Sequence, residues 1–205
     1  MKQITSSHPD AAALLAAVLA DDGIVVVPTD TIYGLSTPLS SRAGYQRILE
    51  IKRCRSGRQF LHLASSLSMV ERYIRTWGCG SKRRLGAVWP APLTGVFLAG
   101  AKCPDWVGET IAFRIPASGL LTRMIDLLGE PVVSTSVNIT GEAPLGDIDQ
   151  IGERVGEHVE LFVTGGLTVG SRPSTIVDFT GANPVVIRKG AYDWEAEAGD
   201  ANPSN

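Results

Sequence analysis

An apolar, β-branched run near the N-terminus constrains the fold more than any other feature of this sequence. Residues Ile24–Val27 are typical of a buried strand, and Pro28 ends it because proline has no N–H to donate to a neighbouring strand. Two threonines, an aspartate and a tyrosine follow, closed by Gly34. Polar side chains directly after a buried strand lie where open α/β sheets bind ligands, although an Asp/Thr turn alone would give the same pattern.

The length and composition favour one large α/β domain. The chain has 205 residues, of which 44% are hydrophobic, enough to bury a sizeable core. No apolar stretch could span a bilayer, and the N-terminus lacks the apolar core of a signal peptide. The three cysteines are odd in number and lack CxxC spacing, so we expect neither a disulfide framework nor a metal site. We therefore predict a cytoplasmic protein that does not bind membranes.

The charge is unevenly distributed along the chain. Residues 193–205 contain four acidic side chains and no Lys or Arg, which leaves 19 basic against 17 acidic side chains in residues 1–192, a net of +2. We expect one domain over residues 1–192 and a short, disordered acidic tail over 193–205. A strong nonspecific nucleic-acid binder would show a larger basic excess.

Strand and helix patterns alternate along the whole chain. Helices are predicted at residues 9–21, with Ser7 as the cap, and at 41–53, 68–76, 81–88, 119–128 and 148–157; strands are predicted at 24–27, 59–64, 95–98, 110–115, 131–135, 159–163, 175–179 and 185–188. The pair 95–98 and 110–115, and the last two strands, could be antiparallel neighbours. The fold class is α/β with α+β character: a twisted, mixed parallel and antiparallel sheet flanked by helices.

Hydroxyl and cationic side chains gather at the ends of these strands. Three hydroxyl-rich segments are Thr29–Tyr33, Ser134–Asn138 and Arg172–Thr175; the cations are Lys52 to Arg58, Arg114 and Arg188. Hydroxyls and backbone N–H groups receive phosphate or carboxylate oxygens, and arginine grips them in bidentate fashion. The set indicates a site for a polyanionic substrate. Taken alone, each hydroxyl-rich segment could serve only to hydrogen-bond the backbone of a turn, and each cation could be a solvated surface charge.

Several common catalytic motifs are missing from the sequence. It contains neither a P-loop nor a GxSxG nucleophile elbow. Of the three histidines, His62 alone lies near the candidate site. Its position is as consistent with a packing or surface role as with a catalytic one.

Seven motifs in order closely resemble the YrdC family, the threonylcarbamoyl-AMP synthases of tRNA modification. They are Pro-Thr-Asp-Thr-Ile-Tyr-Gly-Leu (28–35), Lys52 with its basic neighbours, Trp-Pro-Ala-Pro-Leu-Thr (89–94), Phe-Arg-Ile-Pro (113–116), Ser-Thr-Ser-Val-Asn (134–138), Ser-Thr-Ile-Val-Asp (174–178) and Ile-Arg-Lys-Gly (187–190). The resemblance covers residues 8–190.

The resemblance implies a reaction in which L-threonine, bicarbonate and ATP give L-threonylcarbamoyladenylate and pyrophosphate. Separate partner proteins would then transfer the threonylcarbamoyl group to position 37 of tRNA. The implied fold surrounds a concave, positively lined cavity. Mg²⁺ is expected with ATP, without dedicated protein ligands. A monomer or weak dimer is expected.

The resemblance also assigns roles residue by residue. Threonine would be bound by Thr31, Arg114, Ser134 and Ser174. ATP would contact Cys54, Arg58, Thr110, Ser136, Pro144 and Arg188. The catalytic residues, beside the phosphates, would be Lys52 and Arg58.

One stretch departs from the family pattern. Family members usually have Lys-x-Arg-Pro where this chain has Lys52-Arg53-Cys54-Arg55, so Cys54 occupies the position of the arginine, and Leu63 stands where a histidine is common. The alternative is therefore a family paralogue that binds nucleotide or RNA without synthase activity. A carbamoyl-transfer module like that of hydrogenase maturation proteins is less favoured, because the acylphosphatase and zinc-finger regions that accompany it are missing from this sequence.

Overall fold

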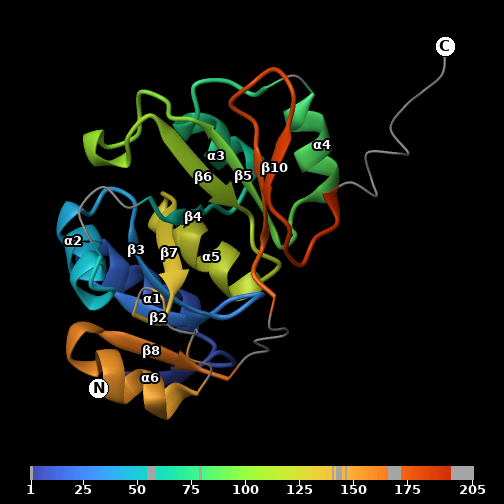
Figure 1. Ribbon diagram of the computed structural model, residues 1–205. Coiled ribbons are helices and arrows are strands. Elements are labelled where there is room, and N and C mark those ends of the chain that lie inside the picture. Colours follow the sequence, from blue (N-terminus) through green and yellow to red (C-terminus); the bar gives the residue numbers. More distant parts are fainter. Residues whose placement is uncertain are drawn as a thin grey trace.

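The computed structural model describes residues 2–54, 59–78, 80–139, 141, 145, 147–165 and 172–194. Figure 1 shows its helices and strands. In chain order they are β1 (Lys2–Thr5), α1 (Ala11–Ala20), β2 (Val25–Pro28), β3 (Tyr33–Pro38), α2 (Arg42–Ile51), β4 (Leu61–Leu63), α3 (Leu67–Tyr73), α4 (Ser81–Val88), β5 (Leu93–Leu98), η1 (Asp105–Val107), β6 (Thr110–Arg114), α5 (Gly119–Leu128), β7 (Val132–Ser136), α6 (Ile148–Val155), η2 (Gly156–His158), β8 (Leu161–Thr164), β9 (Thr175–Asp178) and β10 (Val185–Arg188).

The described strands form one sheet in the order β1-β8-β2-β3-β7-β4-β6-β5-β9-β10. Four pairs are parallel (β1–β8, β2–β8, β4–β6 and β5–β9), and the remaining pairs are antiparallel. This confirms the predicted mixed sheet, including the antiparallel pairs β5–β6 and β9–β10. Because neighbours in the sheet are often far apart in sequence, the order brings distant polar segments together.

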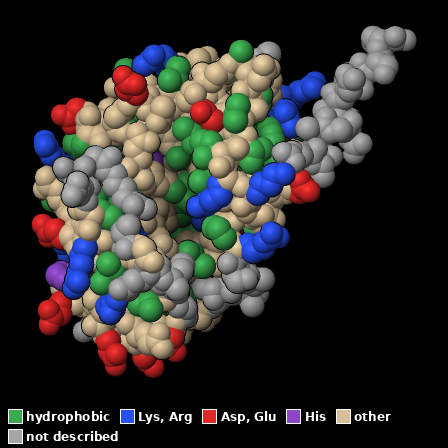
Figure 2. Space-filling model, viewed as in Figure 1, with side chains coloured by type: hydrophobic (Ala, Val, Ile, Leu, Met, Phe, Trp, Pro, Cys, Tyr) green, Lys and Arg blue, Asp and Glu red, His purple; other side chains and the backbone are tan. Residues whose placement is uncertain are grey.

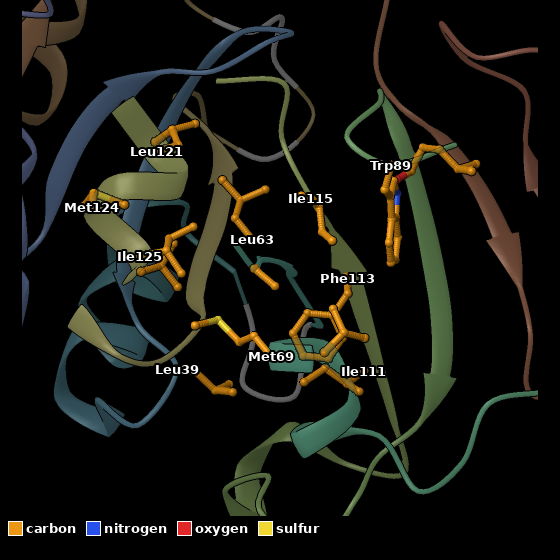
Figure 3. Close-up of a cluster of buried hydrophobic side chains, with 14 of the residues drawn as sticks. Leu39, Leu63, Met69, Trp89, Ile111, Phe113, Ile115, Leu121, Met124 and Ile125 are labelled. Atoms are coloured by element: carbon orange, nitrogen blue, oxygen red, sulfur yellow. The ribbon is translucent and has the colours of Figure 1, made fainter. Parts of the chain in front are cut away.

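Helices cover both faces of the sheet. On β2, Val25 and Val27 belong to one hydrophobic cluster, whereas Val26 belongs to the other, as expected when successive side chains point to opposite faces. The first cluster includes side chains of α1, α3, α4 and α5, and the second includes those of α2 and α6. Figure 3 shows part of the first cluster, where Leu121 of α5 lies near Leu63 of β4. Burial of both faces accounts for the apolar runs in the sequence.

Most elements predicted from the sequence are present, with small differences at their ends. Helices α4 and α5 and strand β10 have the predicted bounds. Ser41 caps α2 by accepting a hydrogen bond from Gly44 N, whereas α1 is preceded by Asp10, so the prediction of Ser7 as its cap is wrong. Since Ala11 is the first helical residue, Ser7 lies too far upstream to reach the first-turn N–H groups.

The sequence interpretation missed two strands. No strand was predicted over Tyr33–Pro38, whose threonine, serine and proline do not resemble one, yet this segment forms the buried β3 between β2 and β7. Segment Lys2–Thr5 forms the edge strand β1, which is mostly exposed and therefore lacks the apolar alternation that predicts strands. None of the described helices combines the length and the apolar character that a membrane span requires.

The packed part of the chain extends past the predicted boundary at residue 192. Trp194 is buried, packs edge-on against Phe179 with ring centroids 5.4 Å apart, and has the guanidinium of Arg84 3.8 Å from its ring centroid. Both contacts stabilise the indole in this position. The expected start of a disordered tail at residue 193 is thus too early, and the rest of that segment lies outside the described residues.

The end of α2 places Lys52, a candidate site residue. Cys54 N donates to Leu49 O, and Arg53 N donates to Glu50 O, both at 2.9 Å, which is the hydrogen-bond pattern of a Schellman motif. Arg53 takes the left-handed position of this motif, with φ of 49°. Glycine is usual there, because a Cβ is strained in that conformation.

Arg53→Gly is therefore expected to raise the free energy of unfolding by about 0.5–1 kcal/mol, since the strain is removed and the lost side chain is exposed. Asp22→Gly is the matched control, because Asp22 occupies the same position after α1 with φ of 59° and aspartate tolerates it better. Urea denaturation measures both. A larger gain for Asp22→Gly would contradict the strain argument.

Candidate functional site

The turn between β2 and β3 is organised by one hydroxyl. Thr29 Oγ1 donates to Ile32 O at 2.6 Å and accepts from the backbone N–H groups of Thr31 and Ile32 at 3.1 and 3.2 Å. These bonds place the buried hydroxyl of Thr31 3.0 Å from that of Thr29. The polar segment is therefore a hydrogen-bonded turn, and it also holds Thr31, one predicted substrate residue, in a defined orientation.

Arg114 extends from the end of β6 to this turn. Its Nη2 lies 3.2 Å from Asp30 Oδ1, and its Nη1 donates to Thr31 Oγ1 at 3.4 Å. Arg114 is only 3% exposed. Burial lowers the pKa of Arg114; Asp30 opposes this shift, and the charge of Arg188 adds to it. In the described structure, Arg114 Nε is buried without a hydrogen-bond acceptor.

Arg188, at the end of β10, binds the segment before β9. Its Nε and Nη2 donate to Ser174 O at 3.2 and 2.8 Å, and Nη2 also lies 3.3 Å from Ser174 Oγ. Ser174 Oγ in turn lies 2.9 Å from Thr94 Oγ1 on β5. Burial lowers the pKa of Arg188. Two predicted substrate residues, one assigned to threonine and one to ATP, thus contact each other directly.

These contacts leave a local excess of positive charge. Arg188 is close enough for its charge to disfavour the charged form of Arg114, and among the described residues Asp30 is the carboxylate that pairs with Arg114. A buried cation is costly unless an anion or several acceptors compensate it. The free Nε of Arg114 and this excess charge together suit an anionic ligand. Figure 2 shows a hollow in the face of the molecule that is viewed in Figure 1, with Lys or Arg side chains beside it near β10.

Lys52 holds the segment that follows β7. Its buried Nζ donates to Ser136 O at 2.8 Å, to Asn138 O at 3.0 Å and to Asn138 Oδ1 at 2.6 Å. Ser136 Oγ donates to the same Asn138 Oδ1 at 2.7 Å. These contacts bring together two predicted site residues, Lys52 and Ser136. An ammonium group has three N–H donors, so in this arrangement Lys52 orients the Ser136–Asn138 turn.

The other predicted site residues have different surroundings. Ser134 is buried on β7, where a Cβ added to Gly34 would lie 3.0 Å from its hydroxyl, so glycine allows this close approach. Thr110, at the start of β6, donates to Gln59 Oε1 at 3.1 Å and contacts none of the other predicted site residues in the described hydrogen bonds. Arg58 and Pro144 lie outside the described residues.

Cys54 does not supply what an arginine would supply at this position. Its thiol is half-buried and points back to Lys52 O at a distance of 3.6 Å, and the side chain packs against the α2 face of the sheet. A thiol is a weak hydrogen-bond donor and carries no positive charge, whereas a guanidinium is positively charged and binds phosphate in bidentate fashion. The contact with ATP that was predicted for Cys54 would therefore involve no charged side chain at this position.

His62 is a packing residue. It is 5% exposed, its Nδ1 lies 3.2 Å from Ala112 O, and its ring centroid is 5.8 Å from that of Phe113. The adjoining cavity has a volume of about 10 Å³, room for about one water molecule. Burial lowers the pKa of His62 from 6.5 to about 4, although the hydrogen bond to Ala112 O opposes this. The imidazole is thus neutral near pH 7.

The sequence interpretation assigned no role to three residues that complete the site. Asp30 pairs with Arg114, Thr94 contacts Ser174, and Asn138 accepts from both Lys52 and Ser136. All three lie inside the quoted motifs, so their spacing was a usable signal. In the described parts of the chain, no group of three or more His, Cys, Asp or Glu side chains could hold a metal ion.

Comparison with known proteins identifies the family. The profile for Sua5, YciO and YrdC proteins, described as "Telomere recombination", matches residues 17–190. The chain belongs to this family. Uncharacterized protein YciO of Escherichia coli (strain K12) is 28% identical over 181 residues, 86% of this chain and 87% of that protein. A threonylcarbamoyl-AMP synthase of Nitrosococcus oceani is 27% identical over 168 residues, 80% of this chain and 91% of that protein.

Solved structures agree with this fold. The crystal structure of E. coli YciO superposes with a TM-score of 0.82 at 26% identity and covers 94% of this chain and 96% of that chain. P. abyssi Sua5, crystallised with L-threonine, superposes with a TM-score of 0.88 at 23% identity. That match covers 98% of this chain but only 60% of the Sua5 chain, so the present chain is similar to one part of that larger protein.

Proposed function

We propose that this protein is a threonylcarbamoyl-AMP synthase, which forms L-threonylcarbamoyladenylate and pyrophosphate from L-threonine, bicarbonate and ATP. The observation that carries the proposal is the pair of contacts Arg114–Thr31 and Arg188–Ser174, which groups four predicted substrate residues around excess positive charge. The naming of the N. oceani relative and the threonine complex of Sua5 support it. The product would serve tRNA modification through partner proteins.

The proposed roles follow from the chemistry of each side chain. Arg114 would receive the threonine carboxylate, because its Nε is unused and its other nitrogens are already oriented by Asp30 and Thr31. Arg188 would lie against ATP, which brings Mg²⁺ bound to its phosphates. Lys52 would keep the Ser136–Asn138 turn in position for the nucleotide.

The reaction needs little covalent chemistry from the protein. The threonine amine and bicarbonate form a carbamate with loss of water, and a carbamate oxygen then attacks the α-phosphorus of ATP. The bond between the α-phosphorus and the oxygen that bridges it to the β-phosphate breaks, and pyrophosphate leaves. The protein contributes orientation and neutralisation of the negative charge that accumulates as the anionic groups approach each other.

The direct test is pyrophosphate release from MgATP by the purified protein. Release should require both L-threonine and bicarbonate, and mass spectrometry should detect the mixed anhydride of threonylcarbamate and AMP. Reactions without threonine, and with L-valine, which lacks the hydroxyl, are the controls. Pyrophosphate release that is independent of threonine, or no release at all, would contradict the proposed function.

A second candidate rests on Cys54. This residue stands where the synthases usually have an arginine, and its thiol, which points to Lys52 O, cannot replace a guanidinium. In addition, the name of one relative, YciO, assigns it no activity. The chain could therefore bind a nucleotide without forming the adenylate. Saturable ATP binding by calorimetry, with no adenylate product under the conditions above, would favour this second function.

Arg188→Ala is expected to raise KM for ATP about tenfold, with a smaller change in KM for threonine, because a charge-assisted contact to the nucleotide is removed. Lys189→Ala is the matched control, since it removes one neighbouring exposed charge outside the proposed site. Initial rates over a range of ATP concentrations at saturating threonine measure both. An unchanged KM for ATP in Arg188→Ala would remove Arg188 from the nucleotide site.

A further inference from the structure

The segment after β10 turns back against the start of β9. Pro173 O accepts from Ala191 N at 2.9 Å, and a Cβ added to Gly190 would lie 2.3 Å from that same oxygen and 2.5 Å from Thr175 N. Only glycine fits this approach, because real Cβ atoms are essentially never found so close to backbone atoms. Residues 190–192 thus lie directly against the segment that carries Ser174.

A single hydroxyl joins the two segments. Thr175 Oγ1 accepts from Gly190 N at 2.9 Å and from Tyr192 N at 3.2 Å, and it donates to Tyr192 O. A threonine hydroxyl has one hydrogen and two lone pairs, so these three bonds use its full capacity. Thr175 is 1% exposed, and water does not compete for these bonds.

Packing alone does not hold this segment in place. A cavity of about 250 Å³ is lined by Lys189 to Trp194 together with Arg172, Thr175 and Val186. Side chains that border a cavity lack contacts on that side. Besides the Ala191 N–Pro173 O hydrogen bond, the Thr175 hydroxyl and the ring of Trp194, which packs against Phe179 and Arg84, anchor the segment.

The same two stretches of backbone carry two candidate site residues. Ser174 precedes Thr175, and Arg188 lies two residues before Gly190; the guanidinium of Arg188 binds Ser174 O and Oγ. We propose that Thr175 and Trp194 are positioning residues, which hold Ser174 and Arg188 in register with each other and with Thr94. The inference rests on the proposed function for its kinetic consequence only, because the register itself can be measured without turnover.

The test compares Thr175→Val, which removes the hydroxyl with little change in volume, with Thr175→Ser, which keeps it. Thr37→Val is the matched control, because Thr37 is equally buried on β3 and its hydroxyl donates to Gly23 O at 3.2 Å, away from these segments. Thr37→Val is expected to lower Tm by about 3 °C, the effect of one lost hydrogen bond in a chain of this size, and Thr175→Val is expected to lower it further because three hydrogen bonds are lost.

The first readout is the ¹H–¹⁵N resonance of Arg188 Nε, which should exchange slowly with solvent while it is bound to Ser174 O. Thr175→Val should raise that exchange rate about tenfold or more, and Thr175→Ser and Thr37→Val should leave it within about twofold of wild type. Trp194→Phe should behave like Thr175→Ser, and Trp194→Ala like Thr175→Val, because phenylalanine retains the ring packing. Equal exchange rates in Thr175→Val and Thr37→Val would overturn the proposal.

The second readout is kinetic. Thr175→Val should raise KM for ATP about tenfold, as misplacement of Arg188 requires, and Thr37→Val should not. If the wild-type protein forms no adenylate, the proposed function fails, yet the Arg188 resonance still decides the positioning role. If the synthase is active and KM is the same in both valine variants, the positioning role is wrong and the proposed function stands.

Discussion

Arg114→Gln is expected to lower kcat/KM for L-threonine about 100- to 1,000-fold, because the proposed carboxylate partner is lost from a buried position. The same change should lower the free energy of unfolding by about 3 kcal/mol, since it leaves the carboxylate of Asp30 without its cation. Initial rates and urea denaturation measure the two effects. Arg123→Gln, on the exposed side of α5, is the control and should change stability by less than about 0.5 kcal/mol.

A double variant separates folding from activity in this experiment. In Asp30→Asn with Arg114→Gln, both charges of this buried pair are removed, so most of the lost stability should return while activity remains low. If the double variant regained both, Arg114 would act only through the fold. If Arg114→Gln alone retained normal kcat/KM, the proposed carboxylate contact would be wrong.

Lowering the pH from 7 to 5 is expected to reduce the free energy of unfolding by about 2 kcal/mol through His62 alone. Burial lowers the pKa of His62 to about 4 in the native state, whereas the unfolded chain titrates near 6.5. Between these two values the unfolded state binds a proton that the native state does not. The stability contributed by the neutral imidazole is therefore full above about pH 6.5 and is lost as the pH falls towards 4.

His62→Gln should remove this pH dependence, and His158→Gln should retain it because that imidazole is exposed. Urea denaturation at half-unit steps between pH 5 and 7 measures the slope, a range in which most carboxylates are ionised. A slope that persists in His62→Gln would assign the effect to another group. Because His62 faces a cavity with room for about one water molecule, its loss should affect stability more than substrate binding.

The elements with strong local signals were predicted with their bounds. Helix α5 begins after a serine cap at Ser118, whose side chain accepts from Leu121 N, and ends at Gly129, with φ of 82°. In contrast, β3 lies between two strands, where burial and pairing allow polar residues such as Ser36 and Thr37 that local propensity disfavours. Tertiary pairing decided the conformation of this segment, and no local pattern revealed it.

The sequence alone indicated which residue types end the strands, and therefore the family and an anion-binding site. It did not indicate which side chains meet. Arg114 and Asp30 are brought together by the sheet order, as are Lys52 and Asn138, and each pair is more than 80 residues apart in sequence. The same holds for direction: Cys54 points to Lys52 O because the left-handed Arg53 turns the chain there. Local propensities and motif spacing act over a few residues, whereas these contacts depend on strand pairing across the whole sheet, so only the tertiary structure could decide them.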